Sequence, residues 1–108
     1  MVGLTNKEVL IKLKRLKIKL SNRFKIQKFM LFGSRARDDW LLNSDVDVIL
    51  ISPDFKELKF VERSAEIIGY WNSLTDLEPL CYTPEEFKRK SKEIGIVRQA
   101  IKEGIEIK

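Results

Sequence analysis

Apolar residues along the chain follow two spacings, which predict helices in alternation with strands. Over residues 6–21 they recur every three or four positions, which is typical of a helix with one buried face. Thr5 and Glu8 stand where a capping box would begin this helix. A second helix is predicted over residues 56–74, with a packing stripe of Val61, Ala65, Ile68 and Trp71, widened by Phe60, Ile67 and Leu74.

Three segments are rich in the β-branched and aromatic residues that favour strands. The clearest is DVDVILIS, residues 45–52, which alternates at first and then becomes continuously apolar. The other two are FKIQKFMLF, residues 24–32, and DLEPLCY, residues 76–82. Pro79 predicts an edge position for the last strand, because proline cannot donate a hydrogen bond to a neighbouring strand.

A further helix is predicted after the third strand. Thr83 fits its N-cap, Pro84 its first position and Glu86 its third, and the helix is expected to end near Lys92. The remaining predictions are a short helix over 34–40, a loop over 41–44, a helix over 96–103 and a terminal strand in IEIK. This order predicts one domain, residues 1–108, of the α/β (α+β) class: a small mixed sheet of three to four strands flanked by helices.

Composition limits the possible chemistry. The 108 residues include no histidine, so acid–base or metal chemistry would depend on carboxylates. One cysteine, Cys81, excludes an internal disulfide and is expected to be a buried thiol. The net charge of +5 favours an anionic partner, although most lysines fall on predicted helices where a solvated face would place them. No segment is apolar enough to span a membrane and no signal peptide is present, so a cytoplasmic location is expected.

Two aspartates share one face at the start of the clearest strand. Asp45 and Asp47 are two residues apart, so their carboxylates point the same way and repel each other unless a cation lies between them. Carboxylate oxygens favour Mg²⁺ or Mn²⁺, usually together with substrate phosphates. A D-x-D pair by itself is common at strand entrances, so it needs a second feature to indicate a metal site.

The turn FGSRA supplies that second feature. Gly33 lets a ligand approach the backbone closely, and Ser34 at the start of a helix can offer a hydroxyl beside unpaired amides. Arg35 and Arg37 can supply guanidinium groups for phosphate oxygens. The turn and the D-x-D pair together predict a triphosphate beside a metal ion.

These residues resemble the nucleotidyltransferases of the DNA polymerase β superfamily, whose signature is a Gly-Ser turn followed by D-x-D on the next strand. The chain length and YTPEEF, residues 82–87, are similar to the minimal nucleotidyltransferase group. These small prokaryotic domains are often the antitoxin of a toxin–antitoxin pair with a helical ribonuclease-like partner. The resemblance covers nearly the whole chain and implies a polymerase β-like fold.

The resemblance also implies roles for individual residues. Gly33 and Ser34 would hold the triphosphate of ATP or another nucleoside triphosphate, and Asp45 and Asp47 would bind Mg²⁺ or Mn²⁺. A third catalytic carboxylate is expected on the next strand. Glu78 is the first candidate for this metal-binding position, and Asp76 is the alternative because it faces the same side. Asp38 departs from the family pattern by placing a negative charge in the proposed triphosphate loop.

Two functions remain open from the sequence. The first is Mg²⁺-dependent transfer of AMP from ATP to a hydroxyl, on a partner toxin or a small molecule. The second is a non-catalytic antitoxin that neutralises its toxin by contact, as a homo- or hetero-oligomer, with a vestigial nucleotide site. Binding of nucleic acid by the basic helices is disfavoured, because no stacking aromatic surface accompanies the lysines. Other residues left open are Tyr82, as a flank of the site, and the loop residues Trp40, Leu41 and Leu42, as interface anchors or as core.

Overall fold

The sheet has four strands and mixed pairing. The computed structural model describes residues 4–37, 45–73 and 75–108. The strands are β1 (Lys28–Phe32), β2 (Val46–Ile51), β3 (Leu77–Tyr82) and β4 (Ile105–Glu106), in the order β3-β2-β1-β4. β1 is antiparallel to both β2 and β4, whereas β2 and β3 are parallel. The predicted mixed sheet is confirmed, and so is the edge position of β3.

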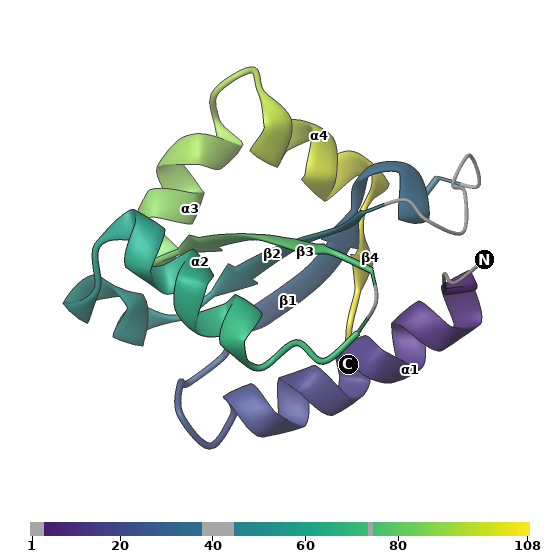
Figure 1. Ribbon diagram of the computed structural model, residues 1–108. Coiled ribbons are helices and arrows are strands. Elements are labelled where there is room, and N and C mark those ends of the chain that lie inside the picture. Colours follow the sequence, from purple (N-terminus) through teal and green to yellow (C-terminus); the bar gives the residue numbers. More distant parts are fainter. Residues whose placement is uncertain (1–3, 38–44, 74) are drawn as a thin grey trace.

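Helices cover both faces of this sheet. They are α1 (Asn6–Leu20), α2 (Phe60–Gly69), α3 (Pro84–Ser91) and α4 (Ile96–Glu103), with short 3-10 turns at Gly33–Arg35 and Pro53–Glu57. Figure 1 shows α3 and α4 on one side of the sheet and α1 and α2 on the other. The described architecture is therefore α+β, as predicted.

Alternation along the strands divides the buried side chains between the two faces. In β2, Val46, Val48 and Leu50 join the cluster beneath α1 and α2, whereas Ile49 and Ile51 join the cluster beneath α3 and α4. Asp47 follows the second set, so its side chain lies on the α3/α4 face of the sheet. Asp47 is tolerated on this face because it is the second residue of β2 and lies near the start of the strand, beside space that α4 leaves open.

The capping predictions are confirmed at α1 and α3. The Thr83 hydroxyl accepts from the Glu86 amide at 3.2 Å, and the Thr83 amide donates to Glu86 Oε1 at 2.8 Å. Thr5 and Glu8 form the same reciprocal pair at α1. Two orphan amides are satisfied at each helix start, which fixes where the helix begins.

The prediction for the middle helix is wrong in both length and orientation. α2 runs only from Phe60 to Gly69, because the chain first forms the 3-10 turn that buries Phe55. Val61 is 75% exposed and Ile68 47% exposed, so the expected packing stripe faces outward. Ile67 is buried instead, together with Arg63.

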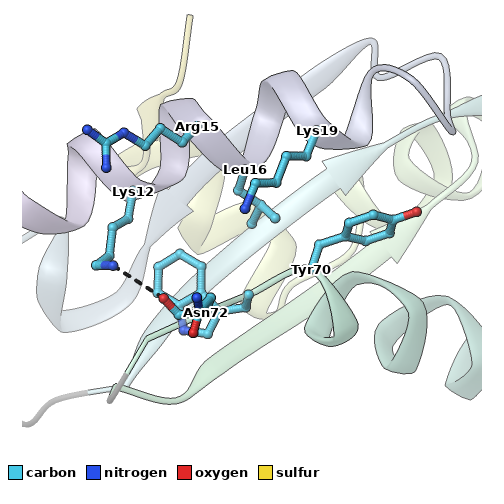
Figure 2. Close-up of a pocket in the computed structure, with 7 residues that line it drawn as sticks. Lys12, Arg15, Leu16, Lys19, Tyr70 and Asn72 are labelled. Atoms are coloured by element: carbon cyan, nitrogen blue, oxygen red, sulfur yellow. Dashed lines mark hydrogen bonds between the residues drawn. The ribbon is translucent and has the colours of Figure 1, made fainter.

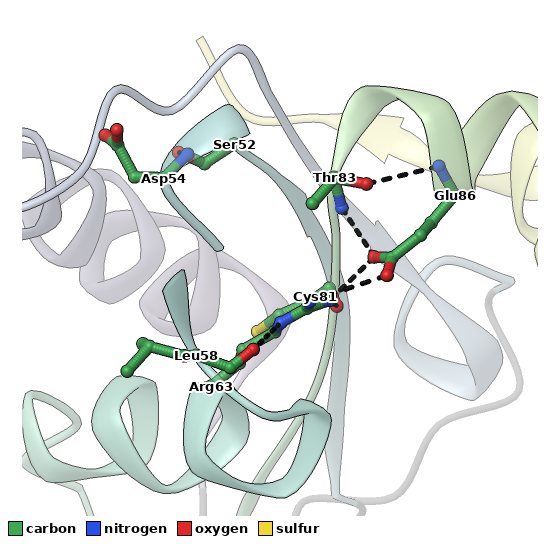
Figure 3. Close-up of polar contacts among 7 residues, drawn as sticks. All are labelled: Ser52, Asp54, Leu58, Arg63, Cys81, Thr83 and Glu86. Atoms are coloured by element: carbon green, nitrogen blue, oxygen red, sulfur yellow. Dashed lines mark hydrogen bonds and ion pairs between the residues drawn. The ribbon is translucent and has the colours of Figure 1, made fainter. Parts of the chain in front are cut away.

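Arg63 is buried because several acceptors surround it (Figure 3). Its guanidinium donates to the carbonyl of Leu58 at 3.0 Å, to the carbonyl of Cys81 at 3.1 Å and to Glu86 Oε1 at 2.6 Å. Burial acts to raise the pKa of Glu86, but hydrogen bonds from Arg63 and from the Thr83 amide hold it below its usual value. This network joins α2, the end of β3 and the start of α3.

Three further expectations can be compared with the structure. The first strand begins at Lys28 rather than at residue 24. Cys81 is buried, as expected, and burial raises the pKa of its thiol to about 12. Within the described ranges, no helix has the length and apolar character needed to cross a membrane. Trp40, Leu41 and Leu42, and the predicted loop that holds them, lie outside the described residues.

Candidate nucleotide-binding site

The pairing of β2 with β3 brings two carboxylates side by side. Asp47 is the register partner of Glu78 on β3, and Phe32 at the end of β1 is its partner on the other side. Adjacent strands are about 4.8 Å apart, and register partners in a parallel pair point to the same face. Asp47 and Glu78 therefore lie together on the α3/α4 face, one residue from the Gly33 turn.

Gly33 lies directly against the carboxylate of Asp47. Its φ of 76° is in the left-handed region that favours glycine. A Cβ added at this position would collide with Oδ2 of Asp47. The turn is closed by the Ala36 amide, which donates to the Gly33 carbonyl at 3.0 Å. Backbone and carboxylate can be this close only because residue 33 has no side chain.

Gly33→Ala is therefore expected to destabilise the protein by about 2 kcal/mol, since alanine is strained at this φ and must displace Asp47. Urea unfolding measures the change. Gly69→Ala is the matched control, because no atom lies within 4 Å of the Cβ that it would add, and its stability should be unchanged or slightly higher. Equal stability of Gly33→Ala and the wild type would contradict this account of the turn.

A cleft of about 450 Å³ opens over the two carboxylates. This volume is within the range of pockets that bind small molecules. The sheet side of the cleft is lined by Phe32, Gly33, Ser34, Arg37, Asp47 and Glu78, and the helix side by Ile96, Gln99, Ala100 and Glu103. The predicted turn and the predicted acidic strand thus meet in one cavity.

The helix side of the cleft was missed by the sequence analysis. Glu103 on α4 pairs with Arg37, with 3.3 Å between Oε2 and Nη1, and Gln99 Nε2 donates to Glu103 Oε1 at 2.6 Å. The only sequence signal was a Gln–Glu pair four residues apart, which is typical of any solvated helix face. The structure shows that this pair holds Arg37 at the wall of the cleft.

The carboxylates affect each other's protonation. Burial, a hydrogen bond with Glu78 and the charges of Glu78 and Asp45 raise the pKa of Asp47 to about 7, while the charge of Arg37 acts to lower it. Burial and the charges of Glu78 and Asp76 also raise the pKa of Asp45. The fold thus holds acidic groups close together without enough positive charge to balance them.

This arrangement fits a hard divalent cation. In the ranges 4–37, 45–73 and 75–108, no three acidic or cysteine side chains already surround one point as metal ligands do. Asp47 and Glu78 are close enough that each negative charge disfavours the other. A divalent cation between them would remove that repulsion, and carboxylate oxygens are the ligands that Mg²⁺ prefers.

The other predicted site residues lie in different places. Asp45 is exposed and immediately precedes β2, near enough to Glu78 for their charges to interact. Asp76 precedes β3 and lines a neighbouring cleft beside α2 that Glu78 also lines, whereas only Glu78 is the register partner of Asp47 and lines its cleft, so the geometry favours Glu78 as that partner. Arg35 points inward and is 1% exposed, with its guanidinium donating to the Leu4 carbonyl, so it does not line the cleft. Asp38 lies outside the described residues.

Comparison with known proteins gives consistent results. The sequence profile of the nucleotidyltransferase domain family matches residues 13–105. A candidate nucleotidyltransferase from Sulfolobus solfataricus has the same fold, with a TM-score of 0.68 and 20% identity over 94% of this chain and 80% of that one. A toxin–antitoxin structure with AMP-PNP also matches, with a TM-score of 0.54 and 22% identity over 88% of this chain and 72% of that one. No curated protein sequence matches the chain.

The match to the family profile spans most of the chain, and it includes both the Gly33 turn and the Asp47–Glu78 pair. The fold of the two solved structures agrees with it. The chain belongs to the nucleotidyltransferase domain family.

Proposed function

We propose that the protein transfers AMP from ATP to a hydroxyl group on a partner toxin, with Mg²⁺ or Mn²⁺ bound at Asp45, Asp47 and Glu78. The observation that carries this proposal is the placement of Asp47 and Glu78 side by side, against the Gly33 turn and within one cleft. The toxin–antitoxin structure with AMP-PNP, which is similar in fold, supports a nucleotide and a protein partner.

The polar groups on the sheet side of the cleft each have a role in this reaction. The acceptor oxygen bonds to the α-phosphorus, and its proton passes to Glu78. The bond between the α-phosphorus and the oxygen that bridges it to the β-phosphate breaks, so that pyrophosphate leaves. Ser34 and the amides of the turn donate hydrogen bonds to phosphate oxygens, and Arg37 adds a positive charge. The bound cations would neutralise the charge that develops on the phosphates. Arg35 has only a structural role in this assignment.

The experiment is a transfer assay with the product of the neighbouring gene as acceptor. ATP labelled at the α-phosphate should label the partner in the presence of Mg²⁺, and ATP labelled at the γ-phosphate should not. This difference separates nucleotidyl transfer from phosphoryl transfer. Glu57→Gln, an exposed acidic residue outside the cleft, is the control and should transfer normally. A folded protein that binds the partner but transfers no α-label would refute the proposal.

A second candidate function is neutralisation of the toxin by contact alone. The exposed apolar side chains of α2 favour it, since Phe60, Val61 and Ile68 together offer a surface for a protein partner. The double variant Asp45→Ala/Asp47→Ala separates the two functions in cells. Loss of neutralisation supports transfer, whereas full neutralisation by this variant supports contact.

A further inference from the structure

A basic pocket lies on the face of the sheet opposite the cleft. It has a volume of about 150 Å³ and is formed between α1 and the end of α2 (Figure 2). Its principal side chains are three cations from α1, Lys12, Arg15 and Lys19, and three residues that follow α2, Tyr70, Trp71 and Asn72. The nucleotide-binding cleft shares none of these residues, so this pocket is a separate feature.

The positive charge of the pocket is only partly offset: Glu8, one turn before Lys12 on α1, is close enough for its charge to interact with that of Lys12. Lys12, Arg15 and Lys19 are spaced so that they share one face of α1. None of them takes part in an ion pair within the part of the chain that the structure describes. Lys12 Nζ donates to the Asn72 carbonyl at 3.2 Å. The C-terminal end of α2 contributes only about half a negative charge, so the pocket keeps a net positive charge.

Two partly buried aromatic residues line the same pocket. The indole of Trp71 donates to the Thr75 carbonyl at 2.6 Å and packs against the core beneath α1. Tyr70 is half-buried and packs against that core as well. Cations beside fixed aromatic rings are the combination that single-stranded nucleic acids use, through backbone phosphates and stacked bases. The structure therefore places two partly buried aromatic side chains beside the cations, an arrangement that was not evident from the sequence.

We propose that this pocket binds a backbone phosphate of single-stranded RNA or DNA. Its 150 Å³ is enough for one phosphate group but is well below the volume of pockets that enclose a whole small molecule. Further positive charge lies on α1, where Lys7 and Lys14 are exposed about a third of a turn around the helix from the pocket residues, and neighbouring phosphates of a strand would meet it. A single strand would contact both the pocket and the exposed lysines of α1, whereas a free anion would contact only the pocket.

The test measures binding of fluorescently labelled 20-nucleotide oligo(U) and oligo(dT) over a range of salt concentrations. Arg15→Ala/Lys19→Ala should weaken binding about tenfold and reduce the slope of log K against log salt by about 0.7, since the pocket holds one phosphate and each phosphate contact contributes about 0.7. Lys88→Ala/Lys92→Ala removes the same charge from the opposite face and is the matched control. This control variant should change the affinity and the salt slope much less than Arg15→Ala/Lys19→Ala does. All four side chains are exposed, and thermal unfolding by circular dichroism should confirm that both variants fold.

A second readout is the fluorescence of Trp71 in a Trp40→Phe background. Oligonucleotides should quench it, while inorganic phosphate at the same phosphate concentration should not. Equal quenching by phosphate would indicate a free-anion site and overturn the proposal. Equal losses of oligonucleotide affinity in Arg15→Ala/Lys19→Ala and Lys88→Ala/Lys92→Ala would also overturn it. Binding would then depend on the net charge of the protein and not on the pocket. Binding to phosphatidylserine vesicles that depends on Arg15 and Lys19, without binding to either oligonucleotide, would identify a lipid headgroup instead.

Discussion

Asp47→Asn should reduce the proposed AMP transfer by at least about a hundredfold, since it removes a proposed metal ligand and leaves the backbone intact. The same variant should stabilise the metal-free protein above neutral pH. Asparagine has nearly the volume of aspartate but carries no charge, so it ends the repulsion between this position and Glu78. Activity and stability should therefore change in opposite directions in one variant, which a residue with a purely structural role would not produce.

The pH dependence follows from the raised pKa of Asp47. In the folded protein this pKa is about 7, against an ordinary value of 3.8, so the folded state holds the proton more tightly than the unfolded chain. The contribution of Asp47 to the stability of the wild type is therefore lost as pH rises from about 4 to 7. Asp47→Asn lacks this loss, and at pH 8 it should be more stable by about 1 kcal/mol after allowance for solvent screening.

Urea unfolding in EDTA at pH 4 and pH 8 measures this effect. The variant and the wild type should differ little at pH 4 and clearly at pH 8. Mg²⁺ should restore stability to the wild type at pH 8 but not to Asp47→Asn. Asp45→Asn is the matched control, and its gain should be smaller because Asp45 is exposed. A difference in stability between Asp47→Asn and the wild type that is the same at the two pH values would contradict the raised pKa.

Arg63→Met is expected to cause the largest loss of stability, about 3 kcal/mol. Methionine keeps much of the volume of the side chain but removes its donors. The carbonyls of Leu58 and Cys81 lose a hydrogen-bond partner, and each such buried acceptor costs about 1 kcal/mol or more. Glu86 also loses its ion pair, although its side chain is 31% exposed and water can replace part of that interaction.

A double-mutant cycle with Glu86→Gln separates these contributions. Glu86→Gln alone should cost about 1 kcal/mol, because Arg63 retains both carbonyls and glutamine can still accept from the Thr83 amide. The double variant should be less destabilised than the sum of the two single variants. If Arg63→Met cost less than Glu86→Gln, the carbonyl hydrogen bonds would not be the main contribution.

The elements with local signals could be predicted from the sequence. The capping residues of α1 and α3 and the alternation in β2 depend on neighbours within a few positions, and the structure confirms them. The orientation of α2 could not be predicted, because hydrophobicity alone placed Val61 inward. The acceptors around Arg63 come from β3 and α3, which are distant in sequence and decide that the arginine is buried.

The site could be predicted only in part, for the same reason. The Gly-Ser turn and the D-x-D pair are local, whereas the choice between Glu78 and Asp76 depends on the register of two strands some thirty residues apart. The direction of Arg35 depends on its contact with Leu4, on the other side of α1 in the sequence. Glu103 entered the site only because α4 packs across the end of β1.

The Arg63 network also determines how the sheet meets other chains. Along the outer edge of β3, Ser64 Oγ donates to the Pro79 carbonyl at 3.2 Å and Arg63 to the Cys81 carbonyl, while Pro79 has no N–H to offer. Half of the outward backbone groups of Leu77, Pro79 and Cys81 that could pair with an incoming strand are therefore already occupied or missing. This edge is protected against strand addition, the usual first step of β-aggregation. A protein partner would have to recognise side chains rather than extend the sheet through β3.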